Sequence, residues 1–434
     1  MGKMYDDYWK ASREQPVEFW GAIAENIHWF KKWDVVMENT NPPFTRWFVG
    51  GLTNACYNAV DRWVEKGKGD VPAYIWESAE MGKSETIKYG QLLERVIQAA
   101  SMLRNCGVKK GDRVLIYLPM IPEACISALA CARIGAVHSI VFAGFSVESL
   151  AIRIDDATPK VLICADASKR AGKTVELKPI VDEAIERAKY KVPLVIVKNR
   201  GIIEYNKVQG RDFEWDKLIK EKGKDKVDCE PMKSEDPTYI LYTSGTTGKP
   251  KGVLRDTGGN IVALYHSMYS IYDCRDDDIY WAASDVGWVV GHSYIIYGPL
   301  FFGITSIIYE GTPIYPDPTI WFKIIEKHKV TCLFTSPTAF RLLRKYDPQI
   351  FKQANISSLR NIFLAGEPLD APTWEWTTNV TGGIPIIDHY WQTESGWAIL
   401  ANPWGIEKIE IKPGSPTFPS WGWELKVVDT DGKE

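Results

Sequence analysis

Apolar and polar positions follow two alternating rhythms along the first half of the chain. Apolar residues spaced three and four apart predict helices at residues 92–103, 122–134, 147–155 and 177–188. Short runs that are apolar throughout predict buried strands at 114–118, 137–142, 161–164 and 193–197. A strand therefore follows each helix, which is the order expected of a parallel sheet with helices on both faces.

The same rhythm returns in the second half, after a charged and weakly periodic stretch at 201–235 that we interpret as a surface connection with a short helix. Strands are predicted at 239–243, 304–309 and 332–335, and helices at 259–272, 319–328 and 337–345. After Pro403 the pattern changes to Gly/Pro-rich turns. Alternation at 424–428 predicts a strand, and the DTDG string at 429–432 predicts a hairpin turn with no second strand after it, which we interpret as a truncated polypeptide.

These patterns predict an α/β fold. We expect two doubly wound α/β subdomains with mostly parallel sheets packed together, plus the start of a small β-rich subdomain. The 434 residues suffice for about three domains or subdomains. The expected division is an N-terminal extension packing on the core, a first α/β subdomain with its connection, a second α/β subdomain, and the start of the β-rich part, at residues 1–84, 85–235, 236–402 and 403–434.

Composition narrows the class of protein. The chain is 45% hydrophobic and 25% charged, as in ordinary globular proteins. Its formal net charge of −3 argues against a nucleic-acid partner, which requires a basic surface. No apolar run approaches the roughly 20 residues that span a bilayer, and residues 1–14 are too polar for a signal peptide. We expect a cytoplasmic protein without a membrane partner, and leave homo-oligomer formation open.

Cysteine and tryptophan indicate core packing. The eight cysteines form no C-x-x-C pair and no Cys/His cluster at zinc-ligand spacing, so we predict no metal site built from thiols. Cys125, Cys131 and Cys164 fall in apolar segments, where free cysteine packs as a small hydrophobe. The 18 tryptophans indicate a large aromatic core, with a ligand-stacking role at one or two positions at most.

The strongest chemical signal is the string YTSGTTGKPKGV at 242–253. Its glycines let the backbone turn tightly and approach a ligand, and consecutive N–H groups can then cradle an anion. Hydroxyl side chains and two lysines add donors and charge, which suits a polyphosphate. The spacing excludes a Walker A loop, because only two residues separate Gly245 from Gly248 and Pro250 follows Lys249. A plain flexible turn is the alternative.

This string closely resembles the signature of the adenylate-forming enzymes, which include acyl-CoA synthetases, luciferases and peptide-synthetase adenylation domains. The strings WAASDVGWVVGHSYIIYGPL (281–300), AGEP (365–368) and YWQTE (390–394) resemble the acetyl- and propionyl-CoA synthetase branch. The string TRWFVGGLTNACYNAVDR (45–62) is more similar to propionyl-type than to acetyl-type enzymes. The resemblance runs from about residue 15 to the end.

The resemblance implies ATP or AMP, Mg²⁺ and coenzyme A as cofactors. Thr393 would contact the α-phosphate, Glu394 would bind Mg²⁺, and Lys249 would act with them in catalysis. The phosphate-binding loop would hold the β- and γ-phosphates through Thr243, Ser244, Gly245, Thr246, Thr247 and Gly248. The adenine and its surroundings would be framed by Gly366, Glu367, Pro368, Asp388, Tyr390 and Gln392.

Two further sites follow from the same resemblance. Trp391 would floor the acyl pocket, with Val289, Val290 and Ala365 as its walls, leaving room for only a few carbons. Ala365 stands where acetate-specific relatives tend to carry valine, which deepens the pocket by about two methyl groups and favours propionate over acetate, with 3-hydroxypropionate left open. The residues expected at CoA are Arg170, Lys173, Gly144 and Ser336. His292 is the histidine expected nearest the site.

The implied enzyme is an AMP-forming acid–thiol ligase that acts through an acyl-adenylate. In relatives the ribose-binding aspartate, the hinge and the mobile C-terminal domain lie beyond the position of Glu434. We therefore expect this polypeptide to bind ATP or AMP but to form acyl-adenylate poorly. The alternatives are a ligase for a longer or aromatic acid and a non-catalytic nucleotide-binding short form.

Overall fold

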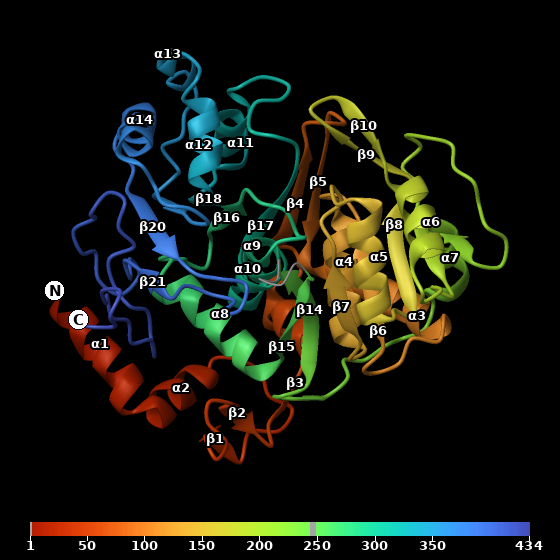
Figure 1. The fold of residues 1–434 in the computed structure, drawn as a ribbon, viewed down its shortest axis with the longest axis horizontal. Helices are drawn as coiled ribbons and strands as arrows, with labels where there is room; N and C mark the ends of the chain where they lie inside the picture. The colour runs from red at the N-terminus through yellow and green to blue at the C-terminus, as the bar shows by residue number, and fades with distance from the viewer. Residues whose placement is uncertain (1, 244–248) are drawn as a thin grey trace.

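The computed structural model describes residues 2–243 and 249–434. Within these residues, strands form two large, mostly parallel sheets, one of seven strands and one of eight, and helices cover them (Figure 1). The predicted α/β fold with packed parallel sheets is confirmed. None of the helices in this described part is both long and apolar enough to cross a bilayer.

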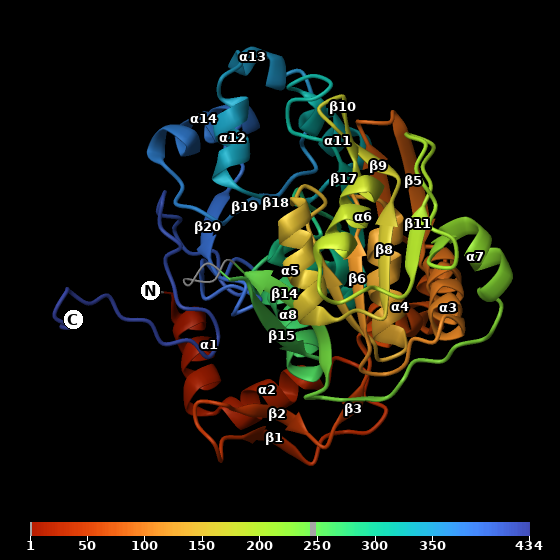
Figure 2. The same cartoon turned by 45° about the vertical axis from the view of Figure 1, so that its right-hand side comes forward.

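The seven-stranded sheet has the order β12-β11-β8-β6-β7-β14-β15 among the described residues, and only β15 is antiparallel to its neighbour. Helices α3, α4 and α7 pack together on one face, and α5 with α6 on the other (Figure 2). The strands are β6 (Arg113–Tyr117), β7 (Val137–Ile140), β8 (Val161–Ala165), β11 (Val195–Lys198), β12 (Asp212–Glu214), β14 (Pro237–Thr243) and β15 (Lys251–Asp256). The helices are α3 (Tyr89–Asn105), α4 (Pro122–Arg133), α5 (Val147–Ala157), α6 (Leu177–Arg187) and α7 (Trp215–Lys222).

The eight-stranded sheet has the order β21-β20-β19-β18-β16-β17-β4-β5 in the described chain, with the two edge strands antiparallel. Its strands are β4 (Pro72–Ser78), β5 (Lys83–Lys88), β16 (Ile279–Ala282), β17 (Thr305–Glu310), β18 (Cys332–Thr335), β19 (Asn361–Leu364), β20 (Ile386–Tyr390) and β21 (Leu400–Ala401). Its helices are α8 (Gly258–Ser270), α9 (Val289–Gly291), α10 (Gly298–Phe302), α11 (Ile320–His328), α12 (Pro337–Leu343), α13 (Pro348–Phe351) and α14 (Ala371–Thr381).

The N-terminal segment packs on the C-terminal part of the chain. Tyr5 donates a hydrogen bond to the carbonyl of Pro419 (2.8 Å), and the Trp9 indole donates to that of Trp423 (2.9 Å). The remaining elements are α1 (Lys3–Glu14), α2 (Pro16–Ala24), β1 (Val35–Glu38), β2 (Arg46–Val49), β3 (Leu52–Thr53), β9 (Ala167–Arg170), β10 (Lys173–Glu176), β13 (Met232–Lys233) and the π-helical segments Tyr57–Asp61, Val64–Lys68 and His292–Tyr297.

One large apolar cluster fuses the two sheets. It includes Tyr74 of β4, Leu115 of β6 and Leu241 of β14, all buried. A second cluster lies between β18 and β19 and the helices α11 to α14, and it contains fully buried Trp281. Cys125, Cys131 and Cys164 are buried free thiols, as their apolar contexts predict. The fold is therefore one packed body in which the sheets share their core.

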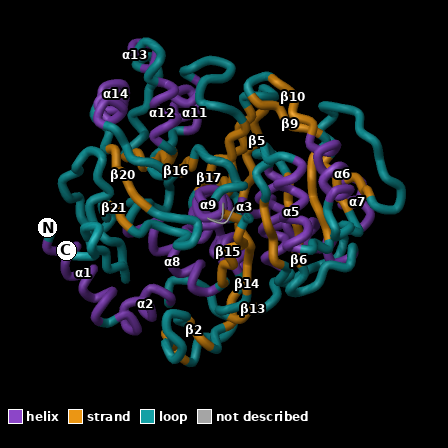
Figure 3. Tube along the Cα trace, viewed as in Figure 1, coloured by secondary structure: helices purple, strands orange, loops and turns teal. Residues whose placement is uncertain are grey.

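Two expectations need correction. The stretch 201–235 contains a further edge strand, β12, which the pattern hides because two of its three residues are acidic. Residues 424–428 form no strand, because no neighbouring strand pairs with them (Figure 3). The turn at Asp429 does form, with its N–H donating to the carbonyl of Lys433 (2.8 Å).

The boundaries expected at residues 84 and 235 do not separate the two sheets. The first boundary, at residue 84, falls inside β5 of the β4–β5 hairpin, and β4 pairs in parallel with β17 of the second half. The hairpin β14–β15 follows the second boundary, yet β14 pairs in parallel with β7 of the first half. Each half of the chain thus donates one hairpin to the other half's sheet.

Candidate functional site

The candidate site forms where parallel strands of the eight-stranded sheet end. Strands β18, β19 and β20 are neighbours, with Thr335 opposite Leu364 and Leu364 opposite Asp388. Ser336 follows β18, Ala365 and Gly366 follow β19, and Tyr390 is the last residue of β20, so the sheet places them along one edge. Ligands of open α/β sheets bind at such carboxyl ends. Three separate segments of the sequence therefore come together because neighbouring parallel strands end at the same edge of the sheet.

The phosphate-binding segment is the connection of the β14–β15 hairpin in the other sheet. Thr243, at the end of β14, lies opposite Lys251 at the start of β15. Lys249 is exposed and precedes β15. The predicted donors Ser244, Gly245, Thr246, Thr247 and Gly248 lie outside the described residues.

Arg255 of β15 joins this hairpin to the turn that follows β20. Its guanidinium donates hydrogen bonds to three carbonyl oxygens, those of Thr393 (2.5 Å), Glu394 (3.3 Å) and Ser395 (3.3 Å). The guanidinium also packs over Gly396, where φ is +76° and an added Cβ would lie 2.7 Å from the Arg255 Cζ. The strand that leaves the phosphate-binding segment is thus fastened to the residues expected at the α-phosphate and Mg²⁺.

The turn itself presents polar groups to solvent. Glu394 and Gln392 are exposed, and Thr393 is half-buried. The Gln392 amide donates to the Tyr390 hydroxyl, and 42% of the Tyr390 surface is exposed, which leaves the ring available for stacking. Glu394 takes part in no ion pair with any residue that the structure describes. Its carboxylate is therefore available to a cation.

The expected adenine frame contains one open position and one tied side chain. Gly366 has φ +100°, and a Cβ added there would meet nothing within 4 Å, so space lies above the backbone. Glu367 accepts hydrogen bonds from the Thr338 N–H (2.7 Å) and the Arg341 guanidinium (2.6 Å). Arg341 also donates to the carbonyl of Pro368 (2.8 Å). The Glu367 carboxylate therefore braces the turn against α12 rather than standing free for a ligand.

Asp388 lies on β20 beneath this frame. It is 7% exposed, and burial raises the pKa of its carboxyl to about 6, although backbone hydrogen bonds from Leu369 and His389 act in the opposite direction. Ionising Asp388 near neutral pH therefore costs folding free energy.

The residues expected to line the acyl pocket pack on one apolar cluster. Val289, Val290 and Trp391 are half-buried against the large core cluster that contains Ala365. The Trp391 ring lies edge-on to Tyr294 (5.5 Å between centroids) and close to His389 (6.3 Å) and Phe334 (6.1 Å). These neighbours hold the indole in place.

The residues expected at CoA divide into two groups. Arg170 and Lys173 face each other across the β9–β10 hairpin, both exposed and neither in an ion pair within the described chain. Glu80 anchors the turn between them by accepting the N–H groups of Ala171 (2.6 Å) and Gly172 (2.9 Å). Arg170 also lies over Phe142 (5.5 Å), which contacts the position of Gly144.

Ser336 stands apart from that group. It precedes α12 at the end of β18, and no hydrogen bond among the described residues joins it to Arg170 or Lys173. The first group offers two cations, and Ser336 offers a hydroxyl at the strand edge.

His292 is buried beside the site rather than in it. Its Nδ1 lies 3.0 Å from the carbonyl of Trp288, and burial lowers its pKa to about 4. The neighbouring Ser293 hydroxyl donates to the Gly396 carbonyl (2.7 Å), so this segment supports the 393–396 turn. Sequence reasoning missed Arg255 and Arg341, because an arginine within a strand or helix carries no motif that reveals its tertiary partner.

Family models match almost the entire chain. Residues 60–434 match the model described as AMP-binding enzyme, and residues 5–59 match that of the acetyl-coenzyme A synthetase N-terminus. The chain is also similar to curated proteins. It is 44% identical to the propionate–CoA ligase of Escherichia coli (strain K12) over 425 residues, which cover 98% of this chain and 67% of that protein.

Two further curated proteins are similar to the chain at about the same level of identity. The human mitochondrial acyl-CoA synthetase short-chain family member 3 is 46% identical over 433 residues, 99% of this chain and 63% of the relative. The acetyl-coenzyme A synthetase of Rubrobacter xylanophilus (strain DSM 9941) is 46% identical over 418 residues, 96% of this chain and 64% of the relative. The chain thus spans about two thirds of the length of these curated relatives. It belongs to the AMP-binding enzymes, in the branch of the acetyl- and propionyl-CoA synthetases.

Proposed function

We propose that this chain binds ATP and a short carboxylic acid and serves a short-chain acyl-CoA synthetase that makes acyl-CoA, AMP and pyrophosphate. The observation that carries the proposal is the attachment of Arg255 to the carbonyls of Thr393, Glu394 and Ser395. It joins the hairpin flanking the glycine-rich segment to the polar turn at the edge of the second sheet. A nucleotide whose phosphates meet the segment can therefore reach that turn.

In the first half-reaction, a carboxylate oxygen attacks the α-phosphorus of ATP and displaces pyrophosphate. The chain's role is alignment and charge stabilisation, without a covalent intermediate on the protein. Thr393 would hold the α-phosphate, and Lys249 would place positive charge beside the leaving pyrophosphate. Tyr390 would stack on the adenine, and Gly366 would let the backbone approach it.

Magnesium is proposed from the donor at hand. The exposed Glu394 carboxylate, which has no ion-pair partner in the described chain, suits a hard cation that prefers oxygen ligands. When bound, Mg²⁺ would neutralise charge on the triphosphate. Glu394 itself would hold the metal beside the residue that contacts the α-phosphate.

Propionate is the acid that we propose. The indole of Trp391, held by its aromatic neighbours, would limit the pocket's length, and the small side chain of Ala365 would leave room for a third carbon. A pocket of this kind discriminates by about 1–3 kcal/mol per methylene. In the second half-reaction, the CoA thiolate would attack the acyl-adenylate and expel AMP, with Arg170 and Lys173 attracting the phosphates of CoA.

Calorimetry with non-hydrolysable acyl-sulfamoyl adenosines tests both parts of the proposal. The three-carbon analogue is expected to bind more tightly than the two- and four-carbon analogues. Failure of all three to bind at high micromolar concentration would contradict the adenylate site itself. Equal affinities would contradict only the choice of acid. The cytoplasmic location remains a prediction.

A further inference from the structure

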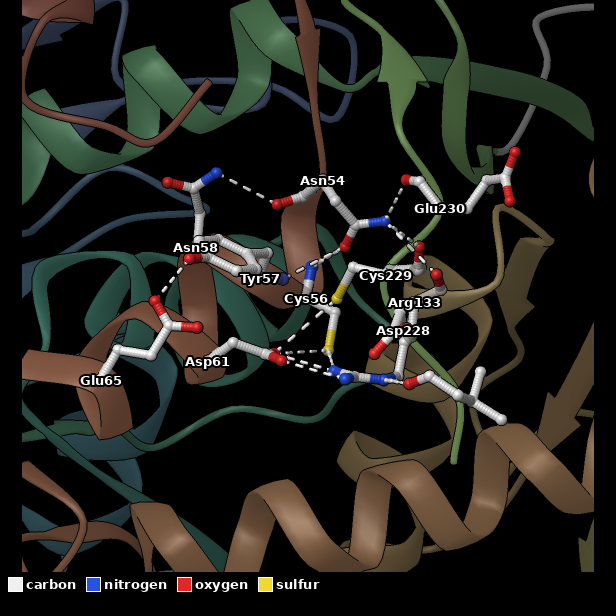
Figure 4. A network of polar contacts seen from close by, with 12 residues as sticks. Asn54, Cys56, Tyr57, Asn58, Asp61, Glu65, Arg133, Asp228, Cys229 and Glu230 are labelled. Carbon is white, nitrogen blue, oxygen red and sulfur yellow. Dashed lines mark hydrogen bonds and ion pairs between the residues drawn. The ribbon is translucent and has the colours of Figure 1, made fainter. Parts of the chain in front are cut away.

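Two cysteines that lie far apart in the sequence meet in a polar network below the sheets. The Cys56 and Cys229 sulfur atoms and a carboxylate oxygen of Asp61 all lie within 4.8 Å of one another. Figure 4 shows the two sulfur atoms facing each other beside the guanidinium of Arg133. Arg133 forms two hydrogen bonds to Asp61 (2.8 and 3.0 Å) and approaches the Cys56 sulfur at 3.5 Å. The cluster belongs to none of the sites described above.

Cys56 is held at the start of a helix. Helical residues begin at Ala55, and the Asn54 side chain caps this end by accepting the N–H groups of Cys56 (2.8 Å) and Tyr57 (3.1 Å). The thiols of Cys56 (3.9 Å) and Cys229 (3.8 Å) both approach the same carboxylate oxygen of Asp61, so one acceptor brings the two sulfur atoms together. Cys56 itself is fully buried.

Cys229 differs from Cys56 in exposure. It is only partly buried, so solvent reaches the pair from its side. Burial, together with a hydrogen bond to Cys56, raises the pKa of the Cys229 thiol far above its usual range.

The network also fixes the segment that carries Cys229. Asn54 donates to the carbonyls of Glu230 (2.9 Å) and Ala132 (2.8 Å), and Arg133 donates to that of Val227 (2.6 Å). These bonds hold both sides of Cys229 against the helix that begins at Ala55. These hydrogen bonds therefore keep the two sulfur atoms close together without a disulfide bond between them.

A metal ion is a poorer occupant of this cluster. Two thiols and one carboxylate supply three ligands, whereas structural zinc sites use four. The Arg133 guanidinium already contacts the carboxylate and one sulfur, so the positive charge that a metal would bring is present. Oxidation of the pair to a disulfide needs no further ligand.

We propose that Cys56 and Cys229 form a redox-active thiol pair that closes to a disulfide with a peroxide as oxidant. The Cys56 sulfur attacks one peroxide oxygen, the O–O bond breaks, and the leaving hydroxide forms water with the Cys56 proton. The Cys229 sulfur then attacks the sulfenic sulfur, the S–S bond forms, and the leaving hydroxide forms water with the Cys229 proton. Two thiols lose two electrons, and hydrogen peroxide becomes two waters.

The test treats the folded chain with hydrogen peroxide, counts free thiols after denaturation, and maps unreduced peptides by mass spectrometry. Of the eight thiols, two are expected to disappear, with the peptides of Cys56 and Cys229 linked and dithiothreitol restoring both. Cys106→Ser is the matched control, because Cys106 is the other partly buried cysteine of the described chain and should not alter the link. In Cys229→Ser, dimedone should trap a sulfenic acid on Cys56.

Three results would overturn the proposal. The first is survival of all eight thiols at peroxide doses that form sulfoxide on exposed Met4. The second is a linked pair that involves Cys106 in place of Cys56. The third is one zinc ion per chain, retained through dialysis by the parent protein and lost in Cys56→Ser. The wild-type peptide map decides the matter even when a variant folds poorly.

Discussion

Replacing Arg255 with methionine tests the attachment on which the candidate site depends. Methionine keeps much of the unbranched stem but removes the donors to the carbonyls of Thr393, Glu394 and Ser395. One hydrogen bond from a charged group contributes about 1.5–3 kcal/mol, and the two bonds at 3.3 Å are weak. We therefore expect a loss of about 2 kcal/mol in the stability of the turn.

The affinity for an adenylate analogue should fall when the turn at residues 393–395 loses stability. If the turn adopts its binding geometry only part of the time, the apparent affinity falls in proportion to that fraction. A loss of about 2 kcal/mol corresponds to a roughly 30-fold higher Kd. Calorimetric titration with the three-carbon sulfamoyl adenosine measures the change, and urea unfolding measures global stability in parallel.

Arg113→Met is the matched control. Arg113 is also half-buried and donates to the carbonyl of Ala157 (2.8 Å) and to the hydroxyl of Thr158 (2.8 Å), at the end of α5. It should lower unfolding stability by a similar amount and leave the Kd unchanged. If Arg255→Met and Arg113→Met bind the analogue equally well, Arg255 is only a structural residue and our account of the site is wrong.

Four further outcomes follow from the same structure. Ala365→Val should weaken the three-carbon analogue by about 1–3 kcal/mol in calorimetry and spare the two-carbon analogue; equal losses would contradict the pocket assignment. Trp391→Gly should gain affinity for five- and six-carbon analogues, and unchanged selectivity would remove the indole from the pocket floor. Glu394→Gln should bind ATP with magnesium no better than the parent binds it in EDTA, whereas a retained magnesium effect would locate the metal elsewhere. Burial raises the pKa of Asp388 to about 6, above the unfolded value of 3.8. Its contribution to stability therefore falls by roughly 2 kcal/mol as pH rises from 4 to 7, and Asp388→Asn should remove that part of the slope in urea unfolding.

Local patterns were sufficient to predict most elements of the two sheets. Strands such as β18 are apolar at nearly every position and bounded by polar residues, so their positions are readable from the sequence. Motif strings such as AGEP and YWQTE also begin where parallel strands end, which explains why Ser336, Gly366 and Tyr390 lie along one edge.

What the sequence could not supply was pairing over long distances. Nothing near residue 72 signals that β4 will pair with β17, and nothing near Arg255 names its three carbonyl partners. Cys56 and Cys229 likewise form no motif in the sequence, because they come close only in the folded chain. The strand expected at 424–428 failed for the converse reason, since alternation without a neighbouring strand does not make a sheet.

The exchange of hairpins between the two sheets has a consequence for synthesis. As the polypeptide leaves the ribosome, β4 and β5 emerge early. The strand that pairs with the other edge of β4, β17, emerges only after the seven-stranded sheet has been translated. Until then the backbone N–H and C=O groups on that edge of β4 are unpaired and can pair with strands of other nascent chains. The eight-stranded sheet therefore cannot form until after the seven-stranded sheet has been translated, and we expect chaperones to shield the waiting hairpin until then.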